Sequence, residues 1–309
     1  MIETILNILV LTVLPFLYIG IINRVKSFWA GRKGPSIIQP LYDFTRLLKK
    51  GEVISDATSF IFKIAPSLVL ASTLLAGMVV PIINHTSILG FDGDFIFFAY
   101  ILALGKFFSV IAAMDTGSSF EGMGAGREVT FSSLVEPAFL IIISSLCLMT
   151  GFTRFEKLSS LLPADSELAA LTVGLSVLVI FIIILVEGCR VPVDDPNTHL
   201  ELTMIHEVMI LDNSGPDLAF SQYGAAAKMV IFSSLIPNLL LPRGIPLHYW
   251  IIFYLAIVFI IAAAIGVIES IVARLRLIHV PQFLLMISSI SLIVLAALII
   301  YTYGTGGAV

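Results

Sequence analysis

Eight mostly apolar segments, each about 20 residues long, recur along this chain of 309 residues. A helix of about 20 apolar residues crosses the roughly 30 Å hydrocarbon core of a bilayer, where only helices and closed barrels satisfy their backbone polar groups. The sequence therefore predicts an all-α, polytopic membrane protein that forms a single transmembrane domain over residues 1–309. The predicted spans are residues 4–23, 62–84, 95–114, 131–152, 168–188, 223–241, 248–270 and 283–303.

Composition narrows the class further. Only 12% of the residues are charged, about half the share found in soluble domains. The first segment carries Glu3, lacks a basic start and is longer than the apolar part of a signal peptide, so we expect it to be retained as a span. The two cysteines, Cys147 and Cys189, are too few for the four thiolates that usually hold an iron–sulfur cluster. We therefore expect no redox centre in this chain, and its small net charge of −4 gives no indication of nucleic-acid binding.

Lysine and arginine residues are concentrated on one side of the predicted topology. Four loops hold 12 of the 17 basic residues, if Lys63 at the start of the second span is counted with the first loop. The other loops hold three basic residues and the spans hold two. Because basic loops tend to stay in the cytoplasm, these four loops are predicted to be cytoplasmic and both termini external. The four loops comprise residues 24–61, 115–130, 189–222 and 271–282.

The first of these loops contains a predicted amphipathic helix. Four apolar residues recur at helical spacing opposite one acidic and three basic residues, which is typical of a helix lying in the membrane interface. A plain basic anchor to anionic lipid explains the same pattern. The apolar residues are Leu41, Phe44, Leu47 and Leu48, and the charged ones are Asp43, Arg46, Lys49 and Lys50.

Five ionisable residues lie within or at the ends of predicted spans: Lys106, Glu136, Glu187, Lys228 and Glu269. Such residues are costly in a membrane and indicate an ion route by default. All five are predicted to lie in the cytoplasmic half, whereas the outer halves of the spans offer Ser, Thr and Asn but no carboxylate. The pattern predicts a half-channel from the cytoplasm, from which an ion leaves sideways into a neighbouring subunit.

Each of these residues also has a purely structural interpretation. Glu187 and Glu269 could reach the interface from the span ends, and Lys228 could extend its ammonium group towards the cytoplasm. Lys106 and Glu136 lie deeper, and an opposite charge would lower the cost of burying both. We therefore expect them to form a pair.

The segment 186–218 holds seven of the 21 acidic residues against a single basic residue, Arg190. Its two histidines, His199 and His206, would lie about 10 Å apart along a helix, which argues against a metal site built from them. The glycines of "GMGAGR" at 122–127 follow no predicted strand, so they do not form a dinucleotide-binding fingerprint.

Two loop motifs resemble those of a known family. "GRKGPSIIQPLYDFTRLLKK" (31–50) and "EGCRVPVDD…LEL" (187–202) resemble loops of the complex I subunit that joins the membrane arm to the redox arm. The second motif departs from that family, because Val193, Asp194 and Asp195 replace Phe-Asp-Leu, and Asn197 and His199 replace two loop glutamates. Residues 115–137 and 191–218 are more similar to the membrane anchor subunit of hydrogenase-4 and formate hydrogenlyase complexes.

The resemblance implies two sets of site residues. The first set would line the ion route. Together with the ionisable residues of the spans, it comprises Lys106, Glu136, Glu187, Arg190, Asp194, Asp195, Glu201, Lys228 and Glu269. The second would face the redox arm and consists of Arg32, Gly34, Pro35, Gln39, Asp43, Asp115, Arg127, Glu128, His199, Glu207 and Asp212.

The implied function is that of a non-catalytic membrane subunit in a multisubunit nickel–iron hydrogenase of a prokaryotic cytoplasmic membrane. It would dock the soluble arm, whose large, small and iron–sulfur subunits hold the nickel–iron centre and the clusters, and would couple electron transfer to antiporter-like membrane subunits. The alternatives are the quinone-site subunit of complex I and a free-standing secondary transporter, which the lack of an inverted repeat disfavours. The sequence leaves open whether protons or sodium ions move and which electron donor feeds the complex.

Overall fold

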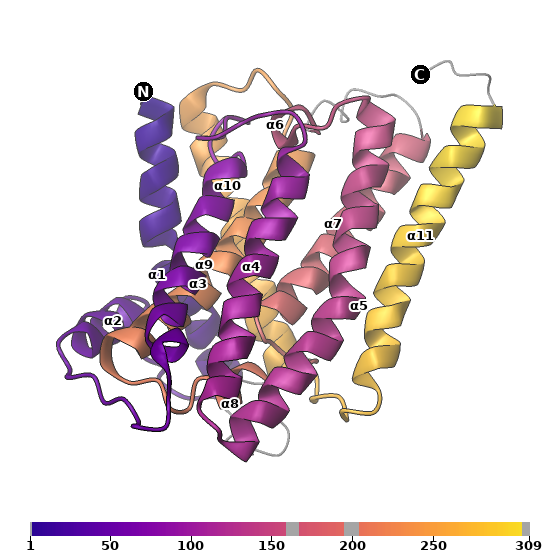
Figure 1. The fold of residues 1–309 in the computed structure, drawn as a ribbon. Coiled ribbons are helices and arrows are strands. Elements are labelled where there is room, and N and C mark those ends of the chain that lie inside the picture. Colours follow the sequence, from indigo (N-terminus) through magenta and orange to yellow (C-terminus); the bar gives the residue numbers. More distant parts are fainter. Residues whose placement is uncertain (1, 159–166, 195–203, 305–309) are drawn as a thin grey trace.

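A computed structural model describes residues 2–158, 167–194 and 204–304. In these residues the chain is helical and has no strand, and eight of its helices are long and apolar enough to span a membrane (Figure 1). The predicted all-α, polytopic fold is confirmed. The helices are α1 (Ile2–Trp29), α2 (Gln39–Leu48), α3 (Phe60–Val79), α4 (Asp94–Asp115), α5 (Ser119–Thr150), α6 (Phe155–Leu158), α7 (Glu167–Glu187), α8 (His206–Met209), α9 (Gly215–Leu240), α10 (Leu247–Ile271) and α11 (Val280–Gly304).

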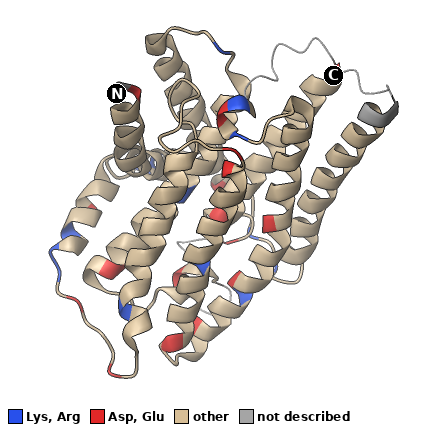
Figure 2. Ribbon diagram, turned by 45° about the horizontal axis from the view of Figure 1, so that its top comes forward, with Lys and Arg blue, Asp and Glu red and all other residues tan. Residues whose placement is uncertain are grey.

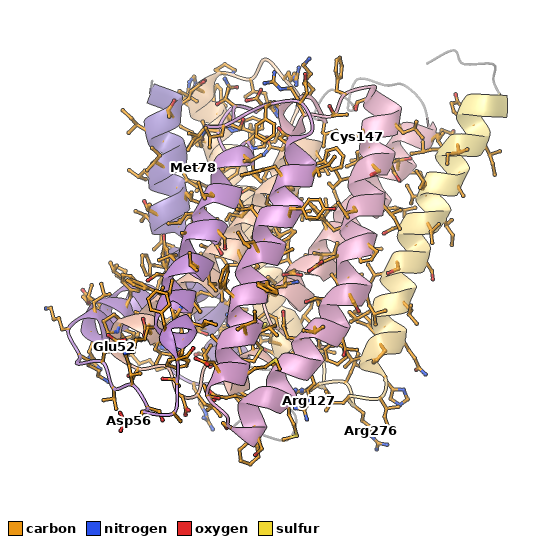
Figure 3. The ribbon with its side chains drawn as sticks, in the orientation of Figure 1. Glu52, Asp56, Met78, Arg127, Cys147 and Arg276 are labelled. Carbon is orange, nitrogen blue, oxygen red and sulfur yellow. The ribbon has the colours of Figure 1, made fainter. Side chains whose placement is uncertain are left out.

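The bundle has two distinct ends, which we name for what they carry. The start of α1 and the end of α11 lie at one end of the bundle, the terminal face, and the short helices α2 and α8 lie at the opposite end, the loop face (Figure 1). Arg127, Arg276, Glu52 and Asp56 project at the loop face, while Met78 and Cys147 lie towards the terminal face (Figure 3). The loops that the sequence predicts to share one side therefore do so.

Helix α9 lies at the centre of the bundle and packs against α1, α3, α7 and α10. Hydrogen bonds between buried hydroxyl groups join it to its neighbours: Tyr18 of α1 to Ser233 at 2.8 Å, and Tyr254 of α10 to Ser234 at 2.6 Å. Membrane helices associate through such bonds and through close packing at small residues. Gly266 of α10 provides that packing, because a Cβ there would lie 3.0 Å from the carbonyl oxygen of Ile22 in α1.

Two loop boundaries differ from the prediction. Helix α5 begins at Ser119, so most of the expected loop 115–130 is helical, and α9 begins at Gly215 rather than near residue 223. Hydropathy missed the first extension because residues 122–127 are glycine-rich and polar. Gly124 allows α5 to pack directly against the segment that leads into α8. A Cβ at this position would lie only 2.9 Å from the carbonyl oxygen of Ile205.

The predicted amphipathic helix is present as α2. Its Phe44 ring packs against Phe16 of α1 and Tyr223 of α9, with ring centroids 5.3 and 5.4 Å apart, respectively. Tyr42 on the other side is exposed. Phe44 is therefore held by protein contacts, whereas Leu41 and Leu48 of the same face are 37% and 41% exposed.

Candidate functional site

Charged residues occur partway along the helices as well as near the two ends of the bundle (Figure 2). Four of them form what we call the lysine–glutamate cluster: Lys106, Glu136, Glu187 and Lys228, from helices α4, α5, α7 and α9. The Lys106 ammonium nitrogen lies 2.6 Å from a Glu187 oxygen and 3.2 Å from a Glu136 oxygen, and Lys228 lies 3.4 Å from the other Glu187 oxygen. The expected Lys106–Glu136 pair is present, and Glu187 is the carboxylate shared by both lysines.

The members of this cluster differ in exposure. The side chains of Glu187, Lys106 and Lys228 are 7%, 12% and 16% exposed, whereas that of Glu136 is 43% exposed. A buried ion pair is not a strong source of stability, but removing one partner typically costs about 3–5 kcal/mol because the other charge is left buried. Three members of the cluster are thus largely shielded, and only Glu136 is substantially exposed, on the outer surface of the bundle.

A second group of charges surrounds Glu269 at the end of α10. This fully buried carboxylate lies 2.7 Å from Lys26 of α1 and 3.3 Å from Arg190. The sequence predicted Glu269 and Arg190 as candidates but missed Lys26, which falls in a predicted loop. Lys26 follows the first predicted span and Glu269 ends the seventh, and both spans run towards the loop face. The similar depth of these two residues was the signal that could have identified the pair.

A third pair lies between Asp194 and Arg274, which are 2.9 Å apart. The Asp194 carboxylate also accepts hydrogen bonds from the backbone N–H groups of Ile205 and His206. It therefore fixes the chain on both sides of residues 195–203. Arg274 was not predicted, and the candidates Asp195, His199 and Glu201 lie outside the described residues.

Residues 187–194, here called the linking turn, join these three groups. The turn contributes Glu187 to the first, Arg190 to the second and Asp194 to the third. Its shape depends on a left-handed backbone at Cys189, where φ is 52°, and on contact with α9 at Gly188, where a Cβ would lie 2.3 Å from the Met229 sulfur. A displacement of this one turn would change all three charge groups together.

Four phenylalanines pack together on the terminal side of the lysine–glutamate cluster. Phe98, Phe139, Phe155 and Phe232 are buried and have ring centroids 5.4–5.6 Å apart. Phe139 follows Glu136 by three residues and Phe232 follows Lys228 by four, which places them about one helical turn further towards the terminal face. We call this group the aromatic plug. It offers no polar atom along which an ion could continue.

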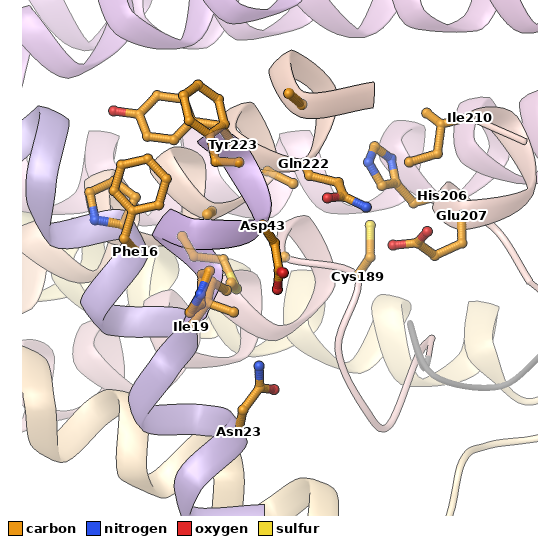
Figure 4. Close-up of a pocket in the computed structure, with 18 of the residues that line it drawn as sticks. Phe16, Ile19, Asn23, Asp43, Cys189, His206, Glu207, Ile210, Gln222 and Tyr223 are labelled. Atoms are coloured by element: carbon orange, nitrogen blue, oxygen red, sulfur yellow. The ribbon is translucent and has the colours of Figure 1, made fainter. Parts of the chain in front are cut away.

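A cavity of about 420 Å³ opens at the loop face between α1, α2, α9 and the linking turn. Phe16 and Tyr223 line one side, and Cys189, His206 and Glu207 line the other (Figure 4). The pKa of the Cys189 thiol is raised well above its ordinary value by burial and by nearby carboxylates, so this thiol stays protonated at neutral pH.

Carboxylates are also present near the terminal face, at positions just outside the predicted spans. Asp94, the first residue of α4, is fully buried and accepts a hydrogen bond from the backbone N–H of Phe155 at 3.0 Å. Glu3 accepts one from the Asn84 side chain, and Glu156 accepts two from Ser87. These acids hold the loops of the terminal face in place.

Next to them lies His85, whose ring packs 4.3 Å from that of Trp250. Burial and the positive charge of Arg243 lower the pKa of this histidine to about 4. His85 is therefore neutral at neutral pH, and the terminal face carries no histidine cation at this position.

Several predicted interface residues make contacts within this chain. Asp115 accepts hydrogen bonds from the Ser59 backbone and hydroxyl and so fixes the start of α3. Arg127 donates to the carbonyl oxygen of Met204 at 2.8 Å, and the N–H of Asp212 donates to Glu121. These residues position the loops of the loop face, whatever they contact beyond the chain.

Residues 2–302 match the protein family described as NADH dehydrogenase. The chain belongs to this family. This match confirms the resemblance to complex I subunits that the loop motifs indicated. Individual relatives within the family show which kinds of complex the chain is similar to.

Hydrogenase-4 component C of Escherichia coli (strain K12) is 32% identical over 235 residues, which cover 76% of this chain and 73% of the relative. Formate hydrogenlyase subunit 4 of the same organism is 24% identical and covers 73% and 72%, respectively. The H subunit of the NADH-quinone oxidoreductase of Rickettsia prowazekii (strain Madrid E) is 25% identical and covers 72% and 67%. The chain is homologous to all three.

A solved structure shares the fold of this family member. It is described as the membrane-bound sulfane sulfur reductase, an archaeal respiratory membrane complex, and one of its chains superposes with a TM-score of 0.78. The two chains are 19% identical, and the match covers 96% of this chain and 98% of the other. The arrangement of helices around α9 therefore occurs also in a subunit of a respiratory membrane complex.

Proposed function

We propose that this chain is the membrane subunit of a multisubunit, membrane-bound nickel–iron hydrogenase of the hydrogenase-4 and formate hydrogenlyase type. It docks a soluble redox arm and couples electron transfer there to ion movement. Similarity to the hydrogenase-4 and formate hydrogenlyase subunits supports the type of complex. The lysine–glutamate cluster, reached from the loop face and closed by the aromatic plug, is the observation that carries the coupling role.

The redox centres in this proposal belong to partner subunits. Nickel–iron and iron–sulfur centres take cysteine thiolate ligands, and this chain has only Cys147 near one face and Cys189 near the other. The hydrogenase large and small subunits and the iron–sulfur subunits would hold them at the loop face. That face is then cytoplasmic, as its lysine and arginine residues indicate, and both termini are external in a prokaryotic cytoplasmic membrane.

Coupling would follow from electrostatics. Electron transfer beside the loop face changes the charge near the linking turn, and groups that interact strongly bind and release ions as a set. In this proposal, the aromatic plug blocks the direct path of an ion from the cluster towards the terminal face. Glu136 is the exit, because a 43% exposed carboxylate is costly against lipid and favourable against a polar neighbour. An antiporter-like membrane subunit is the partner proposed there.

One observation favours a second candidate function, a quinone site. The cavity of about 420 Å³ has aromatic residues on one side and charged residues on the other, and its volume lies in the range of about 300–1,000 Å³ typical of small-molecule sites. A subunit of NADH-quinone oxidoreductase is among the relatives. For this candidate, the head group of a quinone would face Arg190 and Asp43.

Purification of the intact complex through a tag on this chain separates the two candidates. The hydrogenase proposal predicts hydrogen evolution from protons with a reduced viologen as donor, at a rate that quinone-site inhibitors leave unchanged. Quinone reduction that those inhibitors block, without hydrogen evolution, would favour the second candidate and contradict the first.

A further inference from the structure

His206, the first residue of α8, has no part in the ion pairs described above. Its backbone N–H donates to Asp194, but among the described residues its ring Nε2 is buried without a hydrogen-bond partner. Leaving a buried polar atom unpaired typically costs about 1–3 kcal/mol. A ring that served only to fill space would be expected to turn towards a partner, so this orphan nitrogen needs another explanation.

The explanation lies in the cavities around the ring. His206 lines the 420 Å³ cavity, a second cavity of about 40 Å³ and a third of about 30 Å³. The first and second cavities also share Ile210 and Ala225, and the second and third share Val69, Ser109 and Lys228. About 10–15 Å³ of such volume suffices for one water, so each of the small cavities can hold at least one. His206 therefore forms a common wall between the loop-face cavity and two spaces that water can enter.

These spaces lead to the lysine–glutamate cluster. Lys228 lines both small cavities, and Lys106 and Glu128 line the innermost one. Figure 4 places His206 beside Cys189 and Glu207 on the polar side of the large cavity. An ion that moves from the loop face to the cluster along this series of cavities passes the imidazole ring.

The chemistry of this route favours the proton among the candidate ions. A sodium ion needs a shell of oxygen ligands, and in the innermost cavity the Glu128 carboxylate and the hydroxyl groups of Ser72, Thr73 and Ser109 stand beside two ammonium groups. The positive charges of Lys106 and Lys228 oppose the entry of a metal cation there. A proton needs only groups that exchange it. An imidazole does so well near neutral pH because one ring nitrogen can bind a proton while the other releases one.

We propose that His206 is a proton-relay residue between the large cavity and the lysine–glutamate cluster, and that the ion coupled to electron transfer is the proton. The proposal rests on the ion-coupling function proposed above. The unprotonated ring nitrogen accepts a proton from water in the large cavity, and the opposite nitrogen gives its proton to water in the small cavities. Glu128 is the first carboxylate to receive it. Exchange of the ring tautomer then restores the starting state, and no electron moves.

The test uses the intact complex in inverted membrane vesicles, with His206→Gln and His206→Ala as variants. We expect proton uptake per hydrogen evolved, in sodium-free medium, to fall about 100-fold or more, the lower end of the contribution of a general acid–base group. Hydrogen evolution in the presence of an uncoupler should persist. Added imidazole should restore proton uptake to His206→Ala, because the large cavity admits it. His279→Gln, at a loop histidine that lines none of these cavities, is the matched control and should behave as wild type.

Unchanged proton uptake in His206→Gln would overturn the relay. The coupling function would still stand if Glu136→Gln lost proton uptake in the same assay. If neither His206 variant assembles, the wild-type complex decides the choice of ion: gradient formation in sodium-free medium supports a proton, whereas a strict need for sodium ions contradicts it.

Discussion

At the residue scale, the charged side chains of this protein are informative because many of them are buried and paired. The pairs join residues far apart in the sequence, such as Lys26 with Glu269 and Asp194 with Arg274. Hydropathy shows which charged residues fall within spans, and the cost of burial then predicts that each needs a partner, as for Lys106 with Glu136. Neither identifies a partner on a distant helix. Arg274 could not be told from the other loop arginines until the fold brought it to Asp194.

Replacing Arg274 with methionine should destabilise the protein by about 3 kcal/mol, because Asp194, only 2% exposed, would lose its cation. Arg276→Met is the matched control at an exposed position two residues later. The midpoint of thermal unfolding in detergent measures both. Equal midpoints for the two variants would show that the Arg274–Asp194 pair contributes nothing.

The pKa of His85 gives a pH dependence at the terminal face. Since this pKa is lowered to about 4 from an ordinary 6.5, the unfolded chain binds the proton more readily than the folded one, and stability is lost as pH falls from 6.5 towards 4. The loss should approach about 3 kcal/mol at pH 4. In His85→Gln the unfolding midpoint should fall less between pH 7 and pH 4 than in wild type. Parallel pH curves for the two proteins would contradict the assignment.

At the element scale, hydropathy located all eight spans, because each needs about 20 apolar residues whatever its neighbours are. It failed where tertiary contacts replace lipid. The first turns of α5 contain glycines that allow close packing on the segment before α8, and the first turns of α9 lie in protein rather than lipid. The aromatic plug was also missed, since a phenylalanine in a span is indistinguishable from a lipid-facing one until the helices are assembled.

The plug makes a prediction of its own. Phe232→Ala should open space between the cluster and the terminal face, so that a preformed pH gradient across vesicles decays several-fold faster than with wild-type complex. Phe253→Ala, at a 48% exposed position on α10, is the matched control. Decay at the same rate in both variants would mean that the phenylalanines do not close the path.

At the scale of the whole molecule, the fold places three charge groups on one short turn and closes the path beyond one of them. The sequence predicted that titratable groups gather on one side of the membrane. Ion pairs bring four of the five span residues together in the lysine–glutamate cluster, and Glu269 pairs separately with Lys26 and Arg190. The sequence did not predict that residues 187–194 connect the groups, because the connection depends on a left-handed residue and a close helix contact that have no signature in hydropathy. What remains to be tested is whether ions leave the cluster sideways.

The substitution Glu136→Gln tests this directly in the intact complex, because it removes the one exposed carboxylate of the cluster while keeping its shape. Proton uptake per hydrogen evolved in inverted vesicles should fall about 100-fold or more, while hydrogen evolution with an uncoupler largely persists. Glu167→Gln, the same change at an exposed residue on the terminal face, should leave the ratio at the wild-type value. An unchanged ratio in Glu136→Gln would contradict the sideways route.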